Sequence, residues 1–427
     1  MKESDFQKDL LDFLHKSPTP FHATNSLANR LRKSGFIELH ELDKWDINPG
    51  RYFVTRNQSS LIAFQLATRS IGKTGIRMVG AHTDSPTLKL KPLPEVHNKG
   101  LFQLGVEVYG GALLNPWFDR DLSVAGRITK GTKNGHVKNH LIDFEEPVAF
   151  IPSLAIHLDR DANKNRSINP ESDVVPIIAG EEHFKTLEDF LSKHTKNGEK
   201  ILSTDLFFYD TNKAKIIGAK KEFLVGARLD NQLSCYAAVA GLLKANKSEN
   251  CMIVLNDHEE VGSASAAGAD GSFLSDVLNR VTIDPETKLR GLARSLLIST
   301  DNAHGVHPNF SEKHEKNHGP ILNKGPAIKH NANQRYATNS ETAGFFKKLC
   351  RDKNIPVQEF VNRGDMACGS TIGPITASKI GVRTLDVGIS TFGMHSIREL
   401  AGIKDVFYLS AILRQFFNES KDLGANP

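Results

Sequence analysis

The sequence lacks the marks of several classes of protein. Only four of its 427 residues are cysteines, and none has C-x-x-C spacing, which is typical of a reducing compartment. No apolar run approaches the length that spans a bilayer, and the N-terminal segment MKESDFQKDLLDFLHKS has no uninterrupted apolar stretch like that of a signal peptide. We therefore expect a cytoplasmic protein with no membrane partner.

A strong charge imbalance is also missing. The formal net charge is only +5 over 427 residues, and the basic residues form no stripe with interleaved aromatics. A nucleic-acid partner is therefore not expected. The composition is that of a globular protein, with 39% apolar and 24% charged residues, which argues against a collagen-like, coiled-coil or disordered chain.

The chain is long enough for two domains, or for one large domain that carries an insertion. Residues 1–94 open with amphipathic helical patterns at 6–14 and 21–31 and continue with strand-like runs. Residues 95–220 are rich in short β-type segments. In residues 221–427, buried strands are followed by small-residue helices, as in EFLVGARLD before YAAVAGLLKA and CMIVLND before SASAAGAD. These patterns predict an α/β fold, with a mixed, mostly parallel sheet flanked by helices and an inserted β-rich domain.

Side chains that can bind a metal follow strand-like segments in VGAHTD, VGARLD, IVLNDHEE and LISTD, and another lies in GMHS. Each has an ordinary explanation alone: a surface His-Asp pair, a solvated Glu-Glu pair or an aspartate at a helix N-cap. Ligands in open α/β sheets gather at the carboxyl ends of strands, so we expect these tips to converge. Two histidines and three carboxylates suit a pair of zinc ions. The candidates are His82, Asp230, the pair Glu259 and Glu260, Asp301 and His395.

Over nearly its whole length, the sequence resembles the aspartyl aminopeptidase family of two-zinc metallopeptidases. The segments that carry the resemblance are SPTPFHA, GAHTDSPTLKLKP, NPWFDRDLSVAGR, IPSLAIHL, GARLDNQLSCYAA, NDHEEVGSASAAGA, STDNAHGVHPN, NQRYATNSETA, CGSTIGPI and GMHSIRE. The resemblance implies a fold like that of the zinc peptidases and phosphorylases. It also implies a homo-oligomer, a hollow tetrahedral dodecamer in which the inserted domain supplies dimer contacts.

The resemblance implies a role for each metal ligand. Asp230 would bridge two zinc ions, His82 and Asp301 would complete one site, and Glu260 and His395 would complete the other. Cobalt and manganese accept the same ligands and could replace zinc.

Two further carboxylates would serve the metal centre without binding a metal. Asp84, two residues after His82, would accept the second imidazole hydrogen and fix the tautomer of the ring. Glu259 would be the general base, which takes a proton from the attacking water and passes it to the departing amine.

The implied reaction is the removal of N-terminal residues, Asp or Glu by preference, from peptides with a free N-terminus. Binding an acidic side chain needs a cation or a donor, and the resemblance points to His304 and Lys329. It also points to His157 as a residue that reaches the active site of a neighbouring subunit. Asp365, in the loop RGDMACG, is a further candidate for the pocket.

Other functions stay open. A metallocarboxypeptidase or an N-acyl amino acid deacylase on a related sheet would keep the metals, and Lys329 would then bind a terminal carboxylate. A non-catalytic assembly scaffold would keep the fold without the reaction. His314 and His318 exceed what the metals need, and we expect them to be surface residues.

Overall fold

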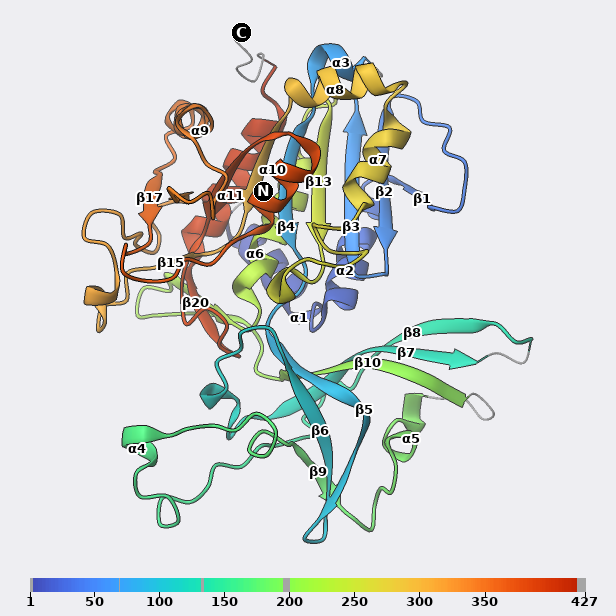
Figure 1. Cartoon of the computed structure of the whole chain (residues 1–427), viewed down its shortest axis with the longest axis vertical. Coiled ribbons are helices and arrows are strands. Elements are labelled where there is room, and N and C mark those ends of the chain that lie inside the picture. Colours follow the sequence, from blue (N-terminus) through green and yellow to red (C-terminus); the bar gives the residue numbers. More distant parts are fainter. Residues whose placement is uncertain (1–2, 69, 132–133, 195–199, 421–427) are drawn as a thin grey trace.

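The computed structural model describes residues 3–68, 70–131, 134–194 and 200–420. In Figure 1 the large sheet and most helices form the upper part of the molecule, and a second sheet lies below it. Three sheets, of nine, six and five strands, are formed within the described ranges.

The nine-stranded sheet is mixed and mostly parallel. Its parallel pairs are β1–β2, β13–β4, β4–β14, β14–β18 and β16–β17, and its antiparallel pairs are β2–β3, β3–β13 and β18–β16. In spatial order the strands are β1 (Ile37–Leu39), β2 (Gly50–Arg56), β3 (Ser60–Leu66), β13 (Cys251–Asn256), β4 (Arg77–His82), β14 (Leu296–Thr300), β18 (Arg383–Gly388), β16 (Ala327–His330) and β17 (Gln358–Val361). The sheet predicted from the sequence is confirmed.

Successive residues of the central strands face opposite sides of this sheet, and both sides are buried. Val79 and Ile253 belong to one hydrophobic cluster, and their neighbours Met78 and Met252 belong to another. Because the side chains of a strand alternate in direction, a strand covered by helices on both faces is continuously apolar. The sheet is therefore the middle layer of three.

Helices cover the two faces unequally. Helices α1 (Glu3–His15), α2 (Pro20–Lys33), α6 (Leu229–Leu243), α9 (Ser340–Asp352) and α11 (Ile403–Phe417) pack on the first cluster. The opposite face has α7 (Phe273–Val281), α8 (Pro285–Ala293), α10 (Ile372–Ile380) and the short α3 (Ile71–Thr74). Among the residues with a described structure, no helix is both long enough and apolar enough to cross a membrane.

The six-stranded sheet is antiparallel throughout and has its own hydrophobic core. Its spatial order is β8 (Val137–Asp143), β7 (Leu122–Gly131), β10 (Lys200–Asp210), β5 (Thr87–Asn98), β6 (Leu101–Tyr109) and β9 (Ile177–Gly180). The short helices α4 (Ala162–Asn165) and α5 (Leu187–Phe190) lie in its connections.

A third sheet was not foreseen. It consists of β11 (Lys215–Ile217), β12 (Phe223–Gly226), β20 (Glu399–Gly402), β19 (Ser390–Phe392) and β15 (Ala303–His304). β5 crosses the predicted boundary at residue 94, and β11, within the predicted insertion, pairs with β12 beyond it. The domain boundaries at 94 and 220 stay a prediction.

The helix expected in SASAAGAD, residues 263–270, is wrong. This segment forms turns, and the next helix begins only at Phe273. Ser263 has a φ of 63°, and a Cβ on Gly268 would lie 2.1 Å from the carbonyl oxygen of Ser263. Small residues are needed here because the chain folds back on itself, not because a helix packs closely.

Candidate metal centre

Neighbouring parallel strands deliver the first candidate ligands to one edge of the large sheet. β13, β4, β14 and β18 lie side by side and run in the same direction. His82 is the last residue of β4, Asp301 directly follows β14, and the chain beyond β13 leads to Glu259 and Glu260. These carboxyl ends therefore meet as the sequence predicts.

Asp230 and His395 come from the connections of the five-stranded sheet. Asp230 lies at the start of α6 but is not helical, with φ −82° and ψ 109°, and its peptide bond to Asn231 is cis. His395, between β19 and β20, has a φ of 68°. The strand in VGARLD therefore reaches the cluster from a second sheet, a topology that the sequence did not predict.

Asp230 lies between two histidines. Its Oδ1 is 3.5 Å from Nε2 of His82, and its Oδ2 is 3.6 Å from Nε2 of His395. Asp301 Oδ1 is also 3.5 Å from Nε2 of His82, and Glu260 Oε2 is 3.3 Å from Nε2 of His395. Each oxygen of Asp230 thus belongs to a different group of one histidine and two carboxylates.

The donor atoms in each group are close enough to share an ion. One atom from each of His82, Asp230 and Asp301 lies within 4.8 Å of the others, and the same holds for Asp230, Glu260 and His395. Two buried oxygens of this cluster, Asp230 Oδ1 and Glu260 Oε1, have no hydrogen-bond partner among the residues that the structure describes. A buried carboxylate oxygen without a donor is costly unless a cation compensates it, so this donor set fits zinc.

A third group joins Glu259 to His82 and Glu260, again with one donor atom of each within 4.8 Å. The general-base candidate thus lies at the centre between the ligands. Burial raises the pKa of Glu259 to about 8 and that of Glu260 to about 7. A carboxyl group with a pKa near neutrality can both take up and release a proton.

The electrostatics of the remaining ligands reflect their mutual contacts. Burial opposes ionisation of Asp230, but its contacts with His395 and His82 outweigh burial and hold the pKa of its carboxyl well below the ordinary value. Burial also acts to lower the pKa of His395, yet Asp230 and Glu260 raise it to about 11. The contacts between acid and imidazole therefore favour an ionised Asp230 and a protonated His395.

Asp84 supports the centre in more ways than the sequence indicated. Nδ1 of His82 lies 3.1 Å from the carbonyl oxygen of Asp84 and 3.4 Å from its carboxylate. The same carboxylate accepts hydrogen bonds from the backbone N–H of Glu259 and Glu260 and from the hydroxyl of Tyr109. It therefore orients the imidazole and holds the turn that carries both glutamates.

The sequence reasoning missed Glu399. This residue is 2% exposed on β20, and its carboxylate accepts a hydrogen bond from the backbone N–H of Asp230 and another from that of His395, each 3.0 Å long. Burial, and then the charge of Asp230, raise the pKa of Glu399 to about 8. An acid inside the buried strand ELAG was the only signal in the sequence.

A cavity of about 340 Å³ opens on the cluster, and His304 and Lys329 line it. Lys329 is 2% exposed, with its ammonium 3.1 Å from Asp301 Oδ2 and 5.3 Å from the centre of the Tyr336 ring. The structure thus brings both residues proposed for the acidic side chain to the metal cluster.

Two other candidates lie away from this cavity. Asp365 is exposed and forms an ion pair with Arg363, and it does not line the cavity. His157 is exposed in the loop between β8 and α4, beside the six-stranded sheet, and it does not line the cavity either. Within one chain, the structure brings neither of them to the metal cluster.

A mixed sheet that gathers histidines and carboxylates at its strand tips is the arrangement of a metal-binding α/β enzyme. Within that class, the family described as "Aminopeptidase I zinc metalloprotease (M18)" matches residues 13–417, and the chain belongs to it. The protein is therefore a zinc metalloaminopeptidase, a hydrolase of peptide bonds.

Relatives support this assignment. A "Probable M18 family aminopeptidase 2" of Ectopseudomonas mendocina is 56% identical over 96% of this chain and 97% of its own. A cryo-EM structure of the Ape4 and Nbr1 complex has a TM-score of 0.93 at 39% identity, over 97% of this chain and 86% of the other. The structure of the S. cerevesiae mApe1 dodecamer has a TM-score of 0.85 at 30% identity, over 98% and 97%.

Proposed function

We propose that this aminopeptidase uses two zinc ions and removes acidic residues from the N-termini of peptides. The observation that carries the two-metal proposal is Asp230, whose two oxygens face His82 and His395 separately. Asp230 would bridge the ions, with His82 and Asp301 completing one site and Glu260 and His395 the other. Cobalt or manganese would fit the same donors.

When bound, zinc would polarise the scissile carbonyl and make water acidic enough to lose its proton near pH 7. Glu259 lies beside His82 and Glu260, where its carboxylate would take that proton and deliver it to the departing amine. The carboxylate of Asp84 would hold Glu259 in place, because it accepts a hydrogen bond from the backbone N–H of Glu259. The preference for a free N-terminus follows from the many carboxylates in the cavity, which offer acceptors to an ammonium group.

The preference for Asp or Glu rests on Lys329 and His304. An ammonium group has three donors, and one of them serves Asp301. The others can meet a substrate carboxylate in the cavity that His304 also lines. The charge of a buried lysine is worth more to an anionic ligand than a charge in water.

The test is a panel of N-terminal Asp, Glu, Leu and Lys amides, assayed with zinc and with a chelator. Asp and Glu amides should be hydrolysed best, and the chelator should remove the activity. Equal rates for the four amides would refute the acidic preference. An N-acetylated Asp amide should not be cleaved, and its turnover would refute recognition of the free amino group.

The family match argues against the other functions. A carboxypeptidase, a deacylase or a scaffold would not explain a match to an aminopeptidase family over residues 13–417. Lys329 alone does not separate these functions, because a terminal carboxylate and an acidic side chain carry the same charge.

We also propose a homo-oligomer built from dimers, with twelve subunits as in the mApe1 structure. In this assembly His157 would approach the active site of a neighbouring subunit. Leu154, Ile156 and Leu158 are 59%, 46% and 75% exposed around it, and apolar side chains gathered on a surface favour a protein contact. Mass photometry should find a dodecamer, and His157→Ala should lower activity without changing zinc content. A fully active monomer would refute both statements.

A further inference from the structure

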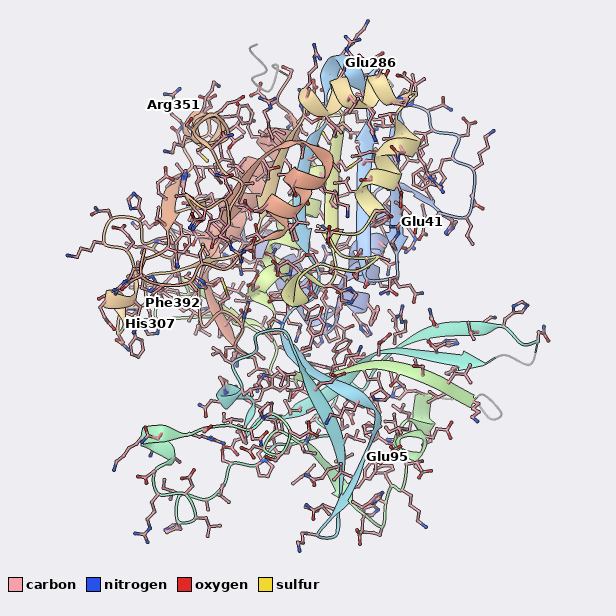
Figure 2. The ribbon with its side chains drawn as sticks, in the orientation of Figure 1. Glu41, Glu95, Glu286, His307, Arg351 and Phe392 are labelled. Carbon is pink, nitrogen blue, oxygen red and sulfur yellow. The ribbon has the colours of Figure 1, made fainter. Side chains whose placement is uncertain are left out.

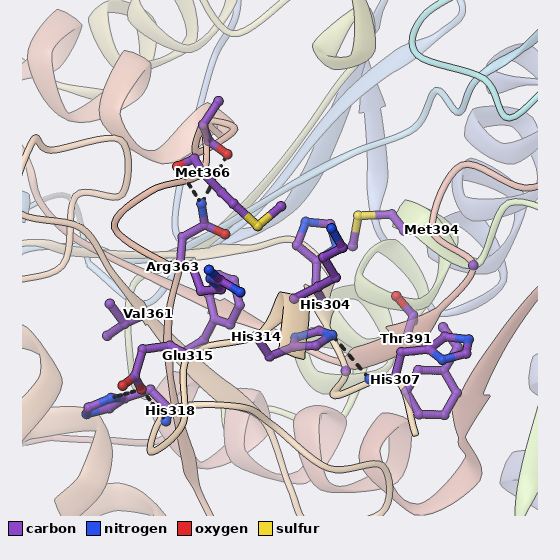
Figure 3. A pocket seen from close by; sticks show the side chains of 17 residues that line it. His304, His307, His314, Glu315, His318, Val361, Arg363, Met366, Thr391 and Met394 are labelled. Carbon is purple, nitrogen blue, oxygen red and sulfur yellow. Dashed lines mark hydrogen bonds and ion pairs between the residues drawn. The ribbon is translucent and has the colours of Figure 1, made fainter. Parts of the chain in front are cut away.

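The histidines that the metals do not need gather around a second cavity. His304, His307, His314 and His318 line a space of about 310 Å³ beside the metal centre (Figure 3). His307 lies at the lower edge of the upper part of the molecule, next to Phe392 (Figure 2). The expectation that His314 and His318 are plain surface residues is therefore incomplete.

This cavity adjoins the one that opens on the metal cluster. His304, Phe360 and Met394 line both spaces. A peptide whose first residue occupies the metal-side cavity must place its following residues in adjoining space. The histidine-lined cavity is such a space, and its volume lies at the lower end of small-ligand sites, which span about 300 to 1,000 Å³.

Backbone contacts fix two of the imidazoles as hydrogen-bond donors. Nε2 of His314 accepts the N–H of His307, and Nδ1 of His307 accepts the N–H of Asn309, each at 3.2 Å. A neutral imidazole that accepts through one nitrogen carries its hydrogen on the other. His314 therefore offers Nδ1–H and His307 offers Nε2–H, even when both rings are uncharged.

Glu315, the acid that lines this cavity, already has hydrogen-bond partners. Oε2 of Glu315 accepts hydrogen bonds from the backbone N–H of Asn317 and of His318, both at 2.8 Å, and lies 2.6 Å from Nδ1 of His318. Lys313 and Arg363 add two positive charges, of which Arg363 is paired with Asp365. Lys313 forms no ion pair within the described ranges. Of the charged side chains that line the cavity, Glu315 and Arg363 are therefore paired within the described residues, and Lys313 is not.

We propose that this cavity is the subsite for the residue that follows the cleaved bond, and that it prefers an acidic side chain there. The proposal rests on the proposed aminopeptidase function and extends it to the second residue of the substrate. The donors of His307 and His314 and the ammonium of Lys313 would bind the carboxylate, while Phe360 and Met394 would contact its aliphatic part. Peptides with two successive acidic residues at the N-terminus would then be the best substrates.

The test compares Asp-Glu, Asp-Lys and Asp amide, which has no second residue, as substrates of the purified zinc enzyme. Asp-Glu should exceed Asp-Lys in kcat/KM by about five- to tenfold, because a lysine would meet a like charge. Lys313→Met should reduce that ratio by about two- to fivefold, the size expected for a partly solvated ion pair. Asp amide hydrolysis should not change.

Lys316→Met is the matched control, since Lys316 is an exposed lysine of the same segment and does not line this cavity. His307→Phe, which keeps the ring against Phe392, should also lower the ratio. Equal wild-type rates for Asp-Glu and Asp-Lys would overturn the subsite, and so would an equal change of the ratio in both lysine variants. An enzyme that cleaves none of the three substrates would instead overturn the proposed function, and the subsite with it.

Discussion

Replacing Glu399 by Gln tests how the fold assembles the metal ligands. The carboxylate of Glu399 joins the backbone N–H of Asp230 to that of His395, and these residues are 165 positions apart in the chain. Glutamine has the same shape but turns one oxygen into an NH₂ group. The backbone N–H of Asp230 or of His395 would then face this NH₂ group, a second donor, in the protein interior.

The expected loss of free energy follows from that lost hydrogen bond. Leaving a buried donor unsatisfied costs about 1 to 3 kcal/mol. Because Asp230 and His395 would both bind metal, part of this cost should appear as weaker metal binding. Loss of a residue that orients ligands typically lowers metal affinity by about 10- to 100-fold. We therefore predict a zinc affinity about 10- to 100-fold below that of the wild type.

The assay is competition for zinc with a chromophoric chelator at a fixed pH above the pKa of about 8 that burial gives Glu399, where its carboxylate is ionised and accepts both bonds. Asp405→Asn is the matched control, because Asp405 is also fully buried and its carboxylate accepts two backbone N–H groups, those of Asn323 and Gly325. It should lower the melting temperature but leave zinc affinity within about twofold of wild type. If Glu399→Gln binds zinc as tightly as Asp405→Asn does, the positioning role is refuted.

Three further outcomes are expected. Glu259→Gln should lower kcat by about 100- to 10,000-fold, the usual size of general-base catalysis, while the zinc content measured by mass spectrometry stays at the wild-type level. Near-wild-type turnover would show that Glu259 is not the general base. Lys329→Met should lower kcat/KM for Asp amide by about 10- to 100-fold and for Leu amide much less, since a charge-assisted hydrogen bond contributes about 1.5 to 3 kcal/mol; equal losses would contradict the proposed carboxylate contact. Burial raises the pKa of Asp405 to about 7, so the folded protein binds this proton more tightly than the unfolded chain does. The protonated Asp405 therefore adds to the free energy of unfolding fully below about pH 4, and this addition is lost as the pH rises through 7. Between pH 5 and 8.5 the melting temperature of the wild type should therefore fall more than that of Asp405→Asn, and parallel curves would contradict the shift.

Much of the fold was predictable because buried parallel strands are continuously apolar. The segments ending at His82 and Thr300 and the run Cys251–Asn256 are fully buried. Each is apolar in the sequence and predicts a strand that leads to a polar tip. Neighbouring tips meet at one edge of a parallel sheet, so the cluster of His82 with Asp301 and the glutamates followed from the pattern.

Other parts depend on contacts that a single sequence does not display. The strand before Asp230 pairs in a separate sheet with β20, which follows about 170 residues later. Glu399 matters only because that pairing places it beside two backbone N–H groups. The turns in SASAAGAD resemble a helix in composition, since small residues serve close backbone packing in both.

The number of zinc ions bound per chain tests the central claim most directly. Zinc should be removed with a chelator and titrated back, with bound metal and activity followed together. The proposed ligand set predicts two equivalents per chain in the wild type and fewer in Asp230→Asn, whose side chain would no longer bridge. Saturation at one equivalent, or an Asp230→Asn protein that still binds two, would contradict the two-metal centre.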